Sequence, residues 1–103
     1  MADKETLIRR SFSYFNTSKS GKLEGLELKH FIAFEYLMDD MPIKAEDVTD
    51  LQVLSFLHER GCAEKNGWPE EDYVQAVTQA GKSVEDLLKL EEIIKKYWES
   101  INA

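Results

Sequence analysis

The chain has 103 residues, of which 43% are hydrophobic and 32% are charged, and its formal net charge is −7 at pH 7. This length and composition indicate one folded domain, or one domain with an appendage, and exclude a disordered chain. The acidic balance argues against a nucleic-acid partner, whose phosphates it would repel, and favours metal cations or basic proteins.

Targeting features are absent from the sequence. No apolar run approaches the roughly 20 residues that span a bilayer, so no membrane span is expected. The charged start, Met1 to Glu5, does not resemble a signal peptide. The single cysteine, Cys62, cannot form an internal disulfide. We therefore expect a reducing location, cytoplasmic or cytoskeletal.

The first half of the chain predicts two helices joined by a loop. Apolar residues at helical spacing favour a first helix over residues 3–15, with Asp3 as its N-cap. Gly21 predicts a turn. A second helix is expected over about 25–38, and it should end before Pro42 because proline disfavours a helical residue before it.

The second half predicts three further helices. The first of these is expected over about 45–59, and a loop over 61–67 follows it. Pro69 fits the first position of the next helix, which Gly81 should end. The residues expected to form the buried face of the helix over 45–59 are Val48, Leu51, Val53, Leu54 and Leu57.

The last predicted helix, residues 84–101, begins after a capping pair formed by Ser83 and Asp86 and is strongly amphipathic. Three roles are open for it: it occupies the chain's own groove as an internal mimic of a target helix, it covers the core, or it mediates dimerisation. Because its buried side chains would contribute a few kcal/mol, we expect a covered helix in a monomer. Its predicted apolar stripe consists of Val84, Leu87, Leu88, Ile94, Trp98 and Ile101.

The most informative segment is residues 16–27, which we call the first loop. Oxygen-bearing side chains fall at Asn16, Ser18 and Ser20, Gly21 follows at once, and Glu27 comes six residues later. This is the spacing D-x-[DN]-x-[DN]-G-x5-E of a calcium-binding helix–loop–helix unit. The carboxylates of the first, third and fifth positions are missing.

On these residues the chain resembles the EF-hand superfamily of calmodulin and its light-chain relatives, over roughly residues 5–78. The resemblance implies an all-α EF-hand pair over residues 1–82, with a C-terminal helix over 83–103 packed on the same domain. The apolar positions that carry the resemblance are Phe12 and Phe15 before the first loop, Leu23 within it, and Leu28, Phe31 and Ile32 after it.

The resemblance also assigns ligands for one calcium ion. Because Lys19 and Lys22 add positive charge to the first loop, any affinity should be weak, on the order of 10⁻⁴ M or worse. The alternative is a loop that keeps its fold and holds no metal. The ligands so implied are Asn16, Ser18, Ser20, the carbonyl of Lys22, Glu24 and Glu27, of which only the last two are anionic.

The second loop, residues 61–67, offers no ligand set in any register that the sequence allows. Its expected role is to support the first loop. The resemblance implies a short strand contact between the two turns in which Leu23 meets Trp68.

Neither a phosphate-binding glycine loop, nor a Ser–His–Asp set, nor zinc-ligand spacing is present in the sequence, so we expect no enzyme. The sequence favours a small regulatory or adaptor protein that binds a helical, basic segment of a partner protein, as a light chain does. The alternative is a calcium-independent structural or light-chain-like subunit of a cytoskeletal or motor assembly.

Overall fold

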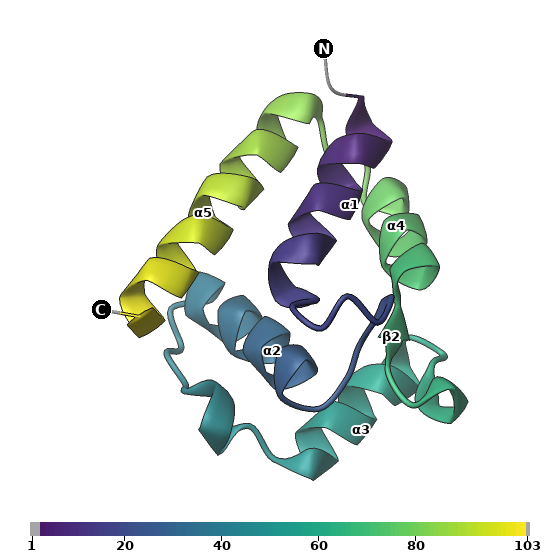
Figure 1. The fold of residues 1–103 in the computed structure, drawn as a ribbon, viewed down its shortest axis with the longest axis vertical. Coiled ribbons are helices and arrows are strands. Elements are labelled where there is room, and N and C mark those ends of the chain that lie inside the picture. Colours follow the sequence, from purple (N-terminus) through teal and green to yellow (C-terminus); the bar gives the residue numbers. More distant parts are fainter. Residues whose placement is uncertain (1–2, 103) are drawn as a thin grey trace. The chain divides into compact units, whose positions relative to one another are not determined.

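The computed structural model describes residues 3–102, and these are mostly helical, as the expected all-α class requires (Figure 1). The helices are α1 (Lys4–Phe15), α2 (Leu26–Met38), α3 (Asp50–Glu59), α4 (Glu70–Gln79) and α5 (Val84–Asn102). The short elements are the 3-10 helices η1 (Ala45–Asp47) and η2 (Ala63–Lys65) and the strands β1 (Lys22–Leu23) and β2 (Trp68–Pro69).

The chain divides into two compact units. One unit is built from Met1–Tyr14 together with Glu70–Ala103, and the other from Phe15–Pro69. The first unit therefore combines α1 with α4 and α5, although about half of the sequence separates them. The second unit holds both loops, the two strands, α2 and α3.

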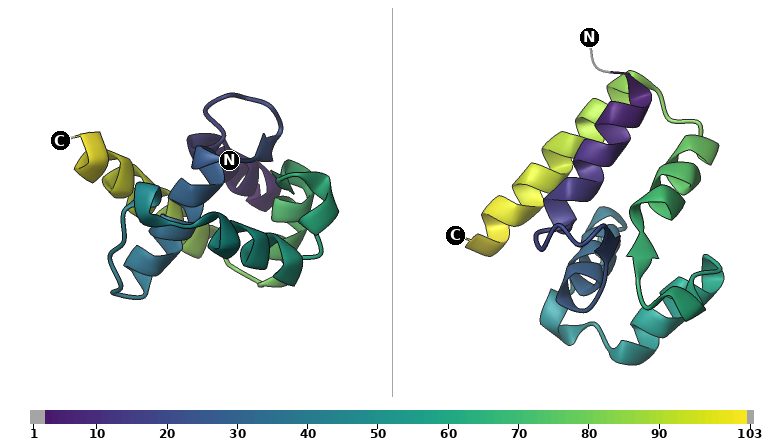
Figure 2. Two further views of the ribbon diagram at one scale, coloured as in Figure 1. Left: turned by 90° about the horizontal axis from the view of Figure 1, so that it is seen from below. Right: turned by 45° about the vertical axis from the view of Figure 1, so that its right-hand side comes forward.

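In the first unit, α1 contacts both α4 and α5. The Ser11 hydroxyl of α1 lies 2.6 Å from the Tyr73 hydroxyl of α4, and the ring centroids of Phe12 and Tyr73 are 5.3 Å apart. Arg10 Nε donates to the Glu91 carboxylate of α5 at 2.6 Å, and Figure 2 shows these two helices running along one another. These contacts join the two ends of the chain in one core.

The helix caps expected from the sequence are confirmed. Asp3 Oδ1 accepts a hydrogen bond from the backbone N–H of Thr6 at 2.7 Å. At the start of α5, Ser83 Oγ accepts a hydrogen bond from the backbone N–H of Asp86 at 3.1 Å. The Asp86 carboxylate accepts one in return from the backbone N–H of Ser83 at 3.3 Å. Each cap satisfies donors that the first turn of a helix leaves without a partner.

The apolar stripe predicted for α5 is partly wrong. Leu87 and Ile94 are buried as expected, but Leu88 is 46% exposed. Successive residues of a helix point about 100° apart, and with Leu87 directed into the core Leu88 lies toward the edge of the buried face. Two further members of the predicted stripe, Val84 and Ile101, are also exposed, and the buried line continues instead through Glu91 and Tyr97.

The core of the second unit is a cluster of aromatic rings centred on Phe31 of α2. The Phe31 ring centroid lies 5.1 Å from that of Phe15, 5.9 Å from that of Phe56 and 5.2 Å from that of Trp68. All three pairs are edge-on, the arrangement that aromatic quadrupoles favour. The cluster ties α2 to α3 and to β2.

The single helix predicted over 45–59 is two elements. Thr49 ends the connection after η1 and caps α3, since its hydroxyl accepts from the backbone N–H of Gln52 at 3.1 Å. The side-chain carbonyl of Gln52 accepts in turn from the Thr49 N–H at 2.8 Å. This reciprocal capping box fixes where α3 begins, so Val48 lies before the helix and does not share a helical face with Leu51.

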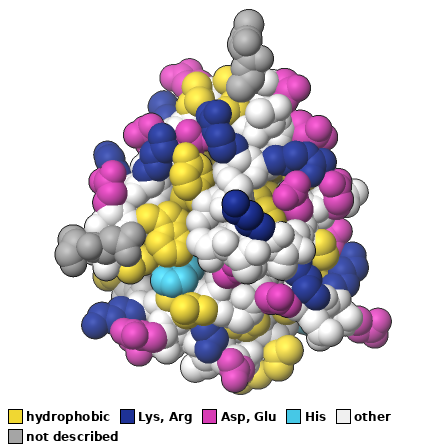
Figure 3. Space-filling view, viewed as in Figure 1, with side chains coloured by type: hydrophobic (Ala, Val, Ile, Leu, Met, Phe, Trp, Pro, Cys, Tyr) yellow, Lys and Arg dark blue, Asp and Glu magenta, His cyan; other side chains and the backbone are white. Residues whose placement is uncertain are grey.

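The prediction that Leu51 and Leu54 are buried is consequently wrong. Phe56 and Leu57 face the core, whereas Leu51 is 73% and Leu54 is 56% exposed. Over residues 3–102, no helix has both the length and the apolar character that crossing a membrane requires. Figure 3 shows hydrophobic side chains on one face interspersed with acidic and basic ones.

Candidate functional site

Two features of the second unit are candidates for function: the first loop and a groove between α2 and α3. The first loop is held by an antiparallel pairing of β1 with β2, in which Leu23 stands opposite Trp68 and Lys22 opposite Pro69. The predicted contact between Leu23 and Trp68 is thereby confirmed. Both side chains are buried, and Lys22 Nζ donates to the Lys65 carbonyl at 3.4 Å.

Asn16, at the first predicted ligand position, lies at the centre of the first loop and is 6% exposed. Its Oδ1 accepts from the backbone N–H of Gly21 at 3.0 Å. Its Nδ2 donates to the Lys22 carbonyl at 2.8 Å, to Glu27 Oε1 at 3.2 Å and to Ser20 Oγ at 3.3 Å. Three of the predicted calcium ligands therefore surround the amide nitrogen of a fourth.

Glu27, at the last predicted ligand position, is bound by donors on both oxygens. Besides the Asn16 amide on Oε1, its Oε2 accepts from the Ser18 N–H at 2.8 Å and from Thr17 Oγ1 at 3.2 Å. Ser18 thus takes part through its backbone, and Glu24 pairs with Lys22 Nζ at 3.6 Å. The structure brings Asn16, Ser20, the Lys22 carbonyl and Glu27 together, and it does not bring Glu24 to them.

This arrangement does not fit a bound cation. A metal ion needs lone pairs directed at one point, and that point holds an NH₂ group. Turning the Asn16 amide over would set its NH₂ group against the Gly21 N–H, with two donors facing each other. Calcium ligation by these residues stays a prediction. Within residues 3–102, no three His, Cys, Asp or Glu side chains cluster as metal ligands.

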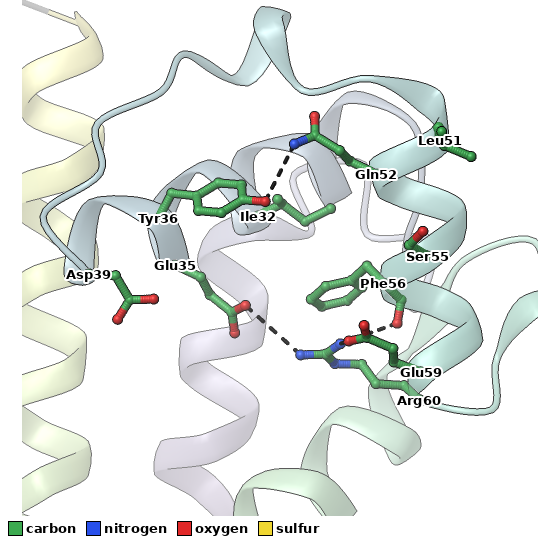
Figure 4. Close-up of a pocket in the computed structure, with 10 residues that line it drawn as sticks. All are labelled: Ile32, Glu35, Tyr36, Asp39, Leu51, Gln52, Ser55, Phe56, Glu59 and Arg60. Atoms are coloured by element: carbon green, nitrogen blue, oxygen red, sulfur yellow. Dashed lines mark hydrogen bonds and ion pairs between the residues drawn. The ribbon is translucent and has the colours of Figure 1, made fainter.

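The second candidate is a groove of about 370 Å³ between α2 and α3 (Figure 4). Ile32 of α2 and Phe56 of α3 are its most deeply buried side chains, at 5% and 8% exposed. Along α2 and its end it is lined by Ile32, Glu35, Tyr36 and Asp39, and along α3 and its end by Leu51, Gln52, Ser55, Phe56, Glu59 and Arg60.

Polar contacts span the groove at two points. Gln52 Nε2 donates to the Tyr36 hydroxyl at 3.4 Å, and Arg60 lies 3.9 Å from the Glu35 carboxylate. The Arg60 guanidinium also covers the Phe56 ring at 3.5 Å from its centroid and donates to the Phe56 carbonyl at 3.2 Å. The contacts of Gln52 with Tyr36 and of Arg60 with Glu35 bridge the two helices, whereas those of Arg60 with Phe56 lie within α3 and its end (Figure 4).

The groove carries more negative than positive charge. Its carboxylates are those of Glu35, Asp39 and Glu59, and Arg60 is the cation among its lining residues. Burial raises the pKa of Glu35, with Asp39 adding to the effect and Arg60 opposing it. The charged form of Glu35 is therefore less well solvated here than in water.

Sequence reasoning missed this groove. It placed Leu51 inside the core and gave Glu35 and Arg60 no role. The signal that could have found it is the pair Thr49 and Gln52, which matches a capping box and moves the start of α3 to Asp50.

Comparisons with protein-family models, with curated proteins and with solved structures find no match to this chain. The case for a function therefore depends on the two sites just described.

Proposed function

We propose that this protein is a non-enzymatic adaptor that binds a basic, amphipathic helix of a partner protein in the groove between α2 and α3. The observation that carries the proposal is the composition of the groove, in which buried apolar side chains lie beside carboxylates. An amphipathic helix with basic residues flanking an apolar stripe is complementary to both.

The apolar side chains of the groove provide a surface on which apolar side chains of a partner helix can pack. Ile32 and Phe56 are its buried apolar side chains, and Leu51, at its edge, is 73% exposed. The lining runs along two turns of each helix, from Ile32 to Asp39 and from Leu51 to Arg60. Two turns suit anchors at positions i, i+4 and i+7 of an incoming helix.

The carboxylates set the preferred charge of the partner. Arg60 is already engaged by the Phe56 ring, by the Phe56 carbonyl and by Glu35 and Glu59, each carboxylate at 3.9 Å. A Lys or Arg of the partner near Glu35 would favour the charged form of that carboxylate, which burial disfavours. Charge complementarity of this kind raises association rates and selects among partners.

Support for the wider proposal comes from the helix–loop–helix segments and the pairing of Leu23 with Trp68, which suit an EF-hand pair. On this proposal the protein is a light-chain-like monomer in the cytoplasm or on the cytoskeleton. The hydrogen bonds of Asn16 favour the calcium-independent form of this function, as in a structural subunit of a motor or cytoskeletal assembly.

The test is a pair of designed helical peptides with the same apolar stripe, one flanked by Lys and Arg and the other by Glu. Titration into the labelled protein, followed by amide NMR, should show saturable shifts on α2 and α3 for the basic peptide only. Leu51→Ser should weaken that binding at least tenfold.

The matched control is Leu88→Ser, which removes an exposed leucine from α5 and should leave the affinity unchanged. Equal binding of both peptides, or shifts confined to other helices, would remove the proposal. Running the titration with calcium and with a chelator separates the two forms of the function, because a structural subunit should bind equally well in both.

A further inference from the structure

We infer that the side-chain amide of Asn16 takes the place of a bound cation, so that the first loop is closed by the chain itself and does not respond to calcium. The inference concerns the loop alone and does not depend on what the groove binds.

The first step is the position of the amide nitrogen. Asn16 Nδ2 donates to a carbonyl, a carboxylate and a hydroxyl oxygen, at 2.8, 3.2 and 3.3 Å. These oxygens come from Lys22, Glu27 and Ser20, at the seventh, twelfth and fifth positions of the loop. A calcium ion would gather the same oxygens at about 2.3–2.6 Å. The amide holds them with hydrogen bonds in its place.

The second step is the orientation of the amide, which the backbone fixes. Gly21 has φ +91° and donates its N–H to Asn16 Oδ1 at 3.0 Å. If the amide turned to offer Oδ1 to a cation, the Gly21 N–H would lose its acceptor and Oδ1 would approach the Lys22 carbonyl. Losing a hydrogen-bond partner at a partly buried group costs more than the net value of the bond.

The third step is the state of Glu27. Its carboxylate accepts three hydrogen bonds, from Asn16 Nδ2, the Ser18 N–H and Thr17 Oγ1. A carboxylate with several donors has its charge stabilised without a metal. Glu27, one of the ligands that the resemblance implies, closes the loop by bridging its beginning and its end.

The fourth step is the effect of one substitution. In Asn16→Asp, Oδ1 can still accept the hydrogen bond from the Gly21 N–H. The second carboxylate oxygen then takes the place of the NH₂ group and faces the Lys22 carbonyl and the Glu27 carboxylate. Without metal this sets acceptors against one another, and with metal it directs their lone pairs at one cation. The variant should therefore lose stability in chelator and regain it with calcium.

The experiment compares wild type, Asn16→Asp and the double variant Asn16→Asp/Glu27→Gln by thermal unfolding in chelator and in millimolar calcium, with amide NMR of Gly21. The wild type should give equal melting temperatures and a flat Gly21 response. Asn16→Asp should have a lower melting temperature than the wild type in chelator, recover it in calcium and give a saturable Gly21 shift, which the wild type lacks. The double variant should not recover.

Asn66→Asp makes the same chemical change in the second loop and should acquire no response to calcium. A saturable Gly21 shift in the wild type would overturn the inference whether or not the variants fold. It would also be overturned if Asn16→Asp matched the wild type in chelator and ignored calcium.

Discussion

Gly67 packs directly against Leu23, so that a Cβ atom at Gly67 would stand 2.8 Å from the Leu23 carbonyl oxygen. Gly67 also has φ +150°, a conformation that L-residues rarely adopt. This approach allows β1 and β2 to pair at the register of Leu23 with Trp68. Glycine is therefore required at position 67, because the backbone of the first loop comes too close for a side chain.

We expect Gly67→Ala to lower the free energy of unfolding by about 3 kcal/mol, since it adds a steric overlap to backbone strain. Chemical denaturation measures the change. Gly81→Ala is the matched control, because Gly81 has φ +71° but no atom within 4 Å of a built Cβ. It should cost only the strain, about 1 kcal/mol. Equal losses in the two variants would contradict the overlap with Leu23.

The pair Arg10–Glu91 provides a second prediction. The Glu91 side chain is only 10% exposed and that of Arg10 is 45% exposed, with Nε 2.6 Å from the carboxylate. Arg10→Met leaves a buried charge with Lys95 at 3.6 Å as its remaining ion pair, and should cost about 2 kcal/mol.

Replacing both partners, Arg10→Met with Glu91→Leu, should recover most of that loss, because no buried charge then remains. A double-mutant cycle measures the coupling. Glu92→Gln is the control, since Glu92 is 67% exposed and pairs with Lys95 at 3.7 Å, and it should change stability by less than about 0.5 kcal/mol. If the double variant is no more stable than Arg10→Met, the unpaired charge of Glu91 is not the cause of the stability that Arg10→Met loses.

Thr49 gives a third prediction, at the start of α3. Thr49→Ala removes the side-chain acceptor for the Gln52 N–H and should cost about 1 kcal/mol in urea unfolding. Thr78→Ala, on the exposed side of α4, is the control and should change stability little. If Thr49→Ser also loses the full amount, the hydroxyl is not what matters at this position.

Tyr97 gives a prediction for pH. Burial raises the pKa of the Tyr97 hydroxyl to about 12 from an ordinary value of 10.0. Because the folded pKa is the higher one, the contribution of this group to stability is complete below the unfolded pKa and is lost as pH rises toward the folded value. The phenolate absorbance of the wild type should therefore include a late step near pH 12.

In Tyr97→Phe the late step should vanish and the loss of stability at alkaline pH should become shallower. Tyr14→Phe serves as the control and should keep the late step. If Tyr97→Phe titrates with the late step intact, the raised pKa belongs to another tyrosine.

Local chemistry explains which parts of the fold could be predicted from the sequence. The caps at Asp3 and Ser83 need only a side chain that reaches a backbone N–H three residues ahead, so the sequence suffices. The contact of Leu23 with Trp68 could also be predicted, because the resemblance to EF-hands implies a short strand contact between the two turns that hold these residues. One helix over 45–59 would set Leu51 on the same face as the buried Val48, but Val48 lies before the Thr49 cap and outside α3, and Leu51 is exposed.

For a similar reason, the candidate site could be predicted from the sequence only in part. Spacing identifies Asn16, Ser20, Lys22 and Glu27 as neighbours, and the structure brings them together. Spacing cannot tell which end of the Asn16 amide faces the others, since that depends on where the Gly21 N–H points in three dimensions. The groove depends on how α3 packs on α2, which no short motif encodes.

The division of the chain has a consequence for its synthesis. Phe12 of α1 packs on Tyr73, and Arg10 pairs with Glu91, so α1 leaves the ribosome long before its partners exist. Residues Phe15–Pro69, in contrast, form a unit that is continuous in the sequence. During translation the residues of α1 that contact α4 and α5 therefore stay without those partners until the last two helices are made.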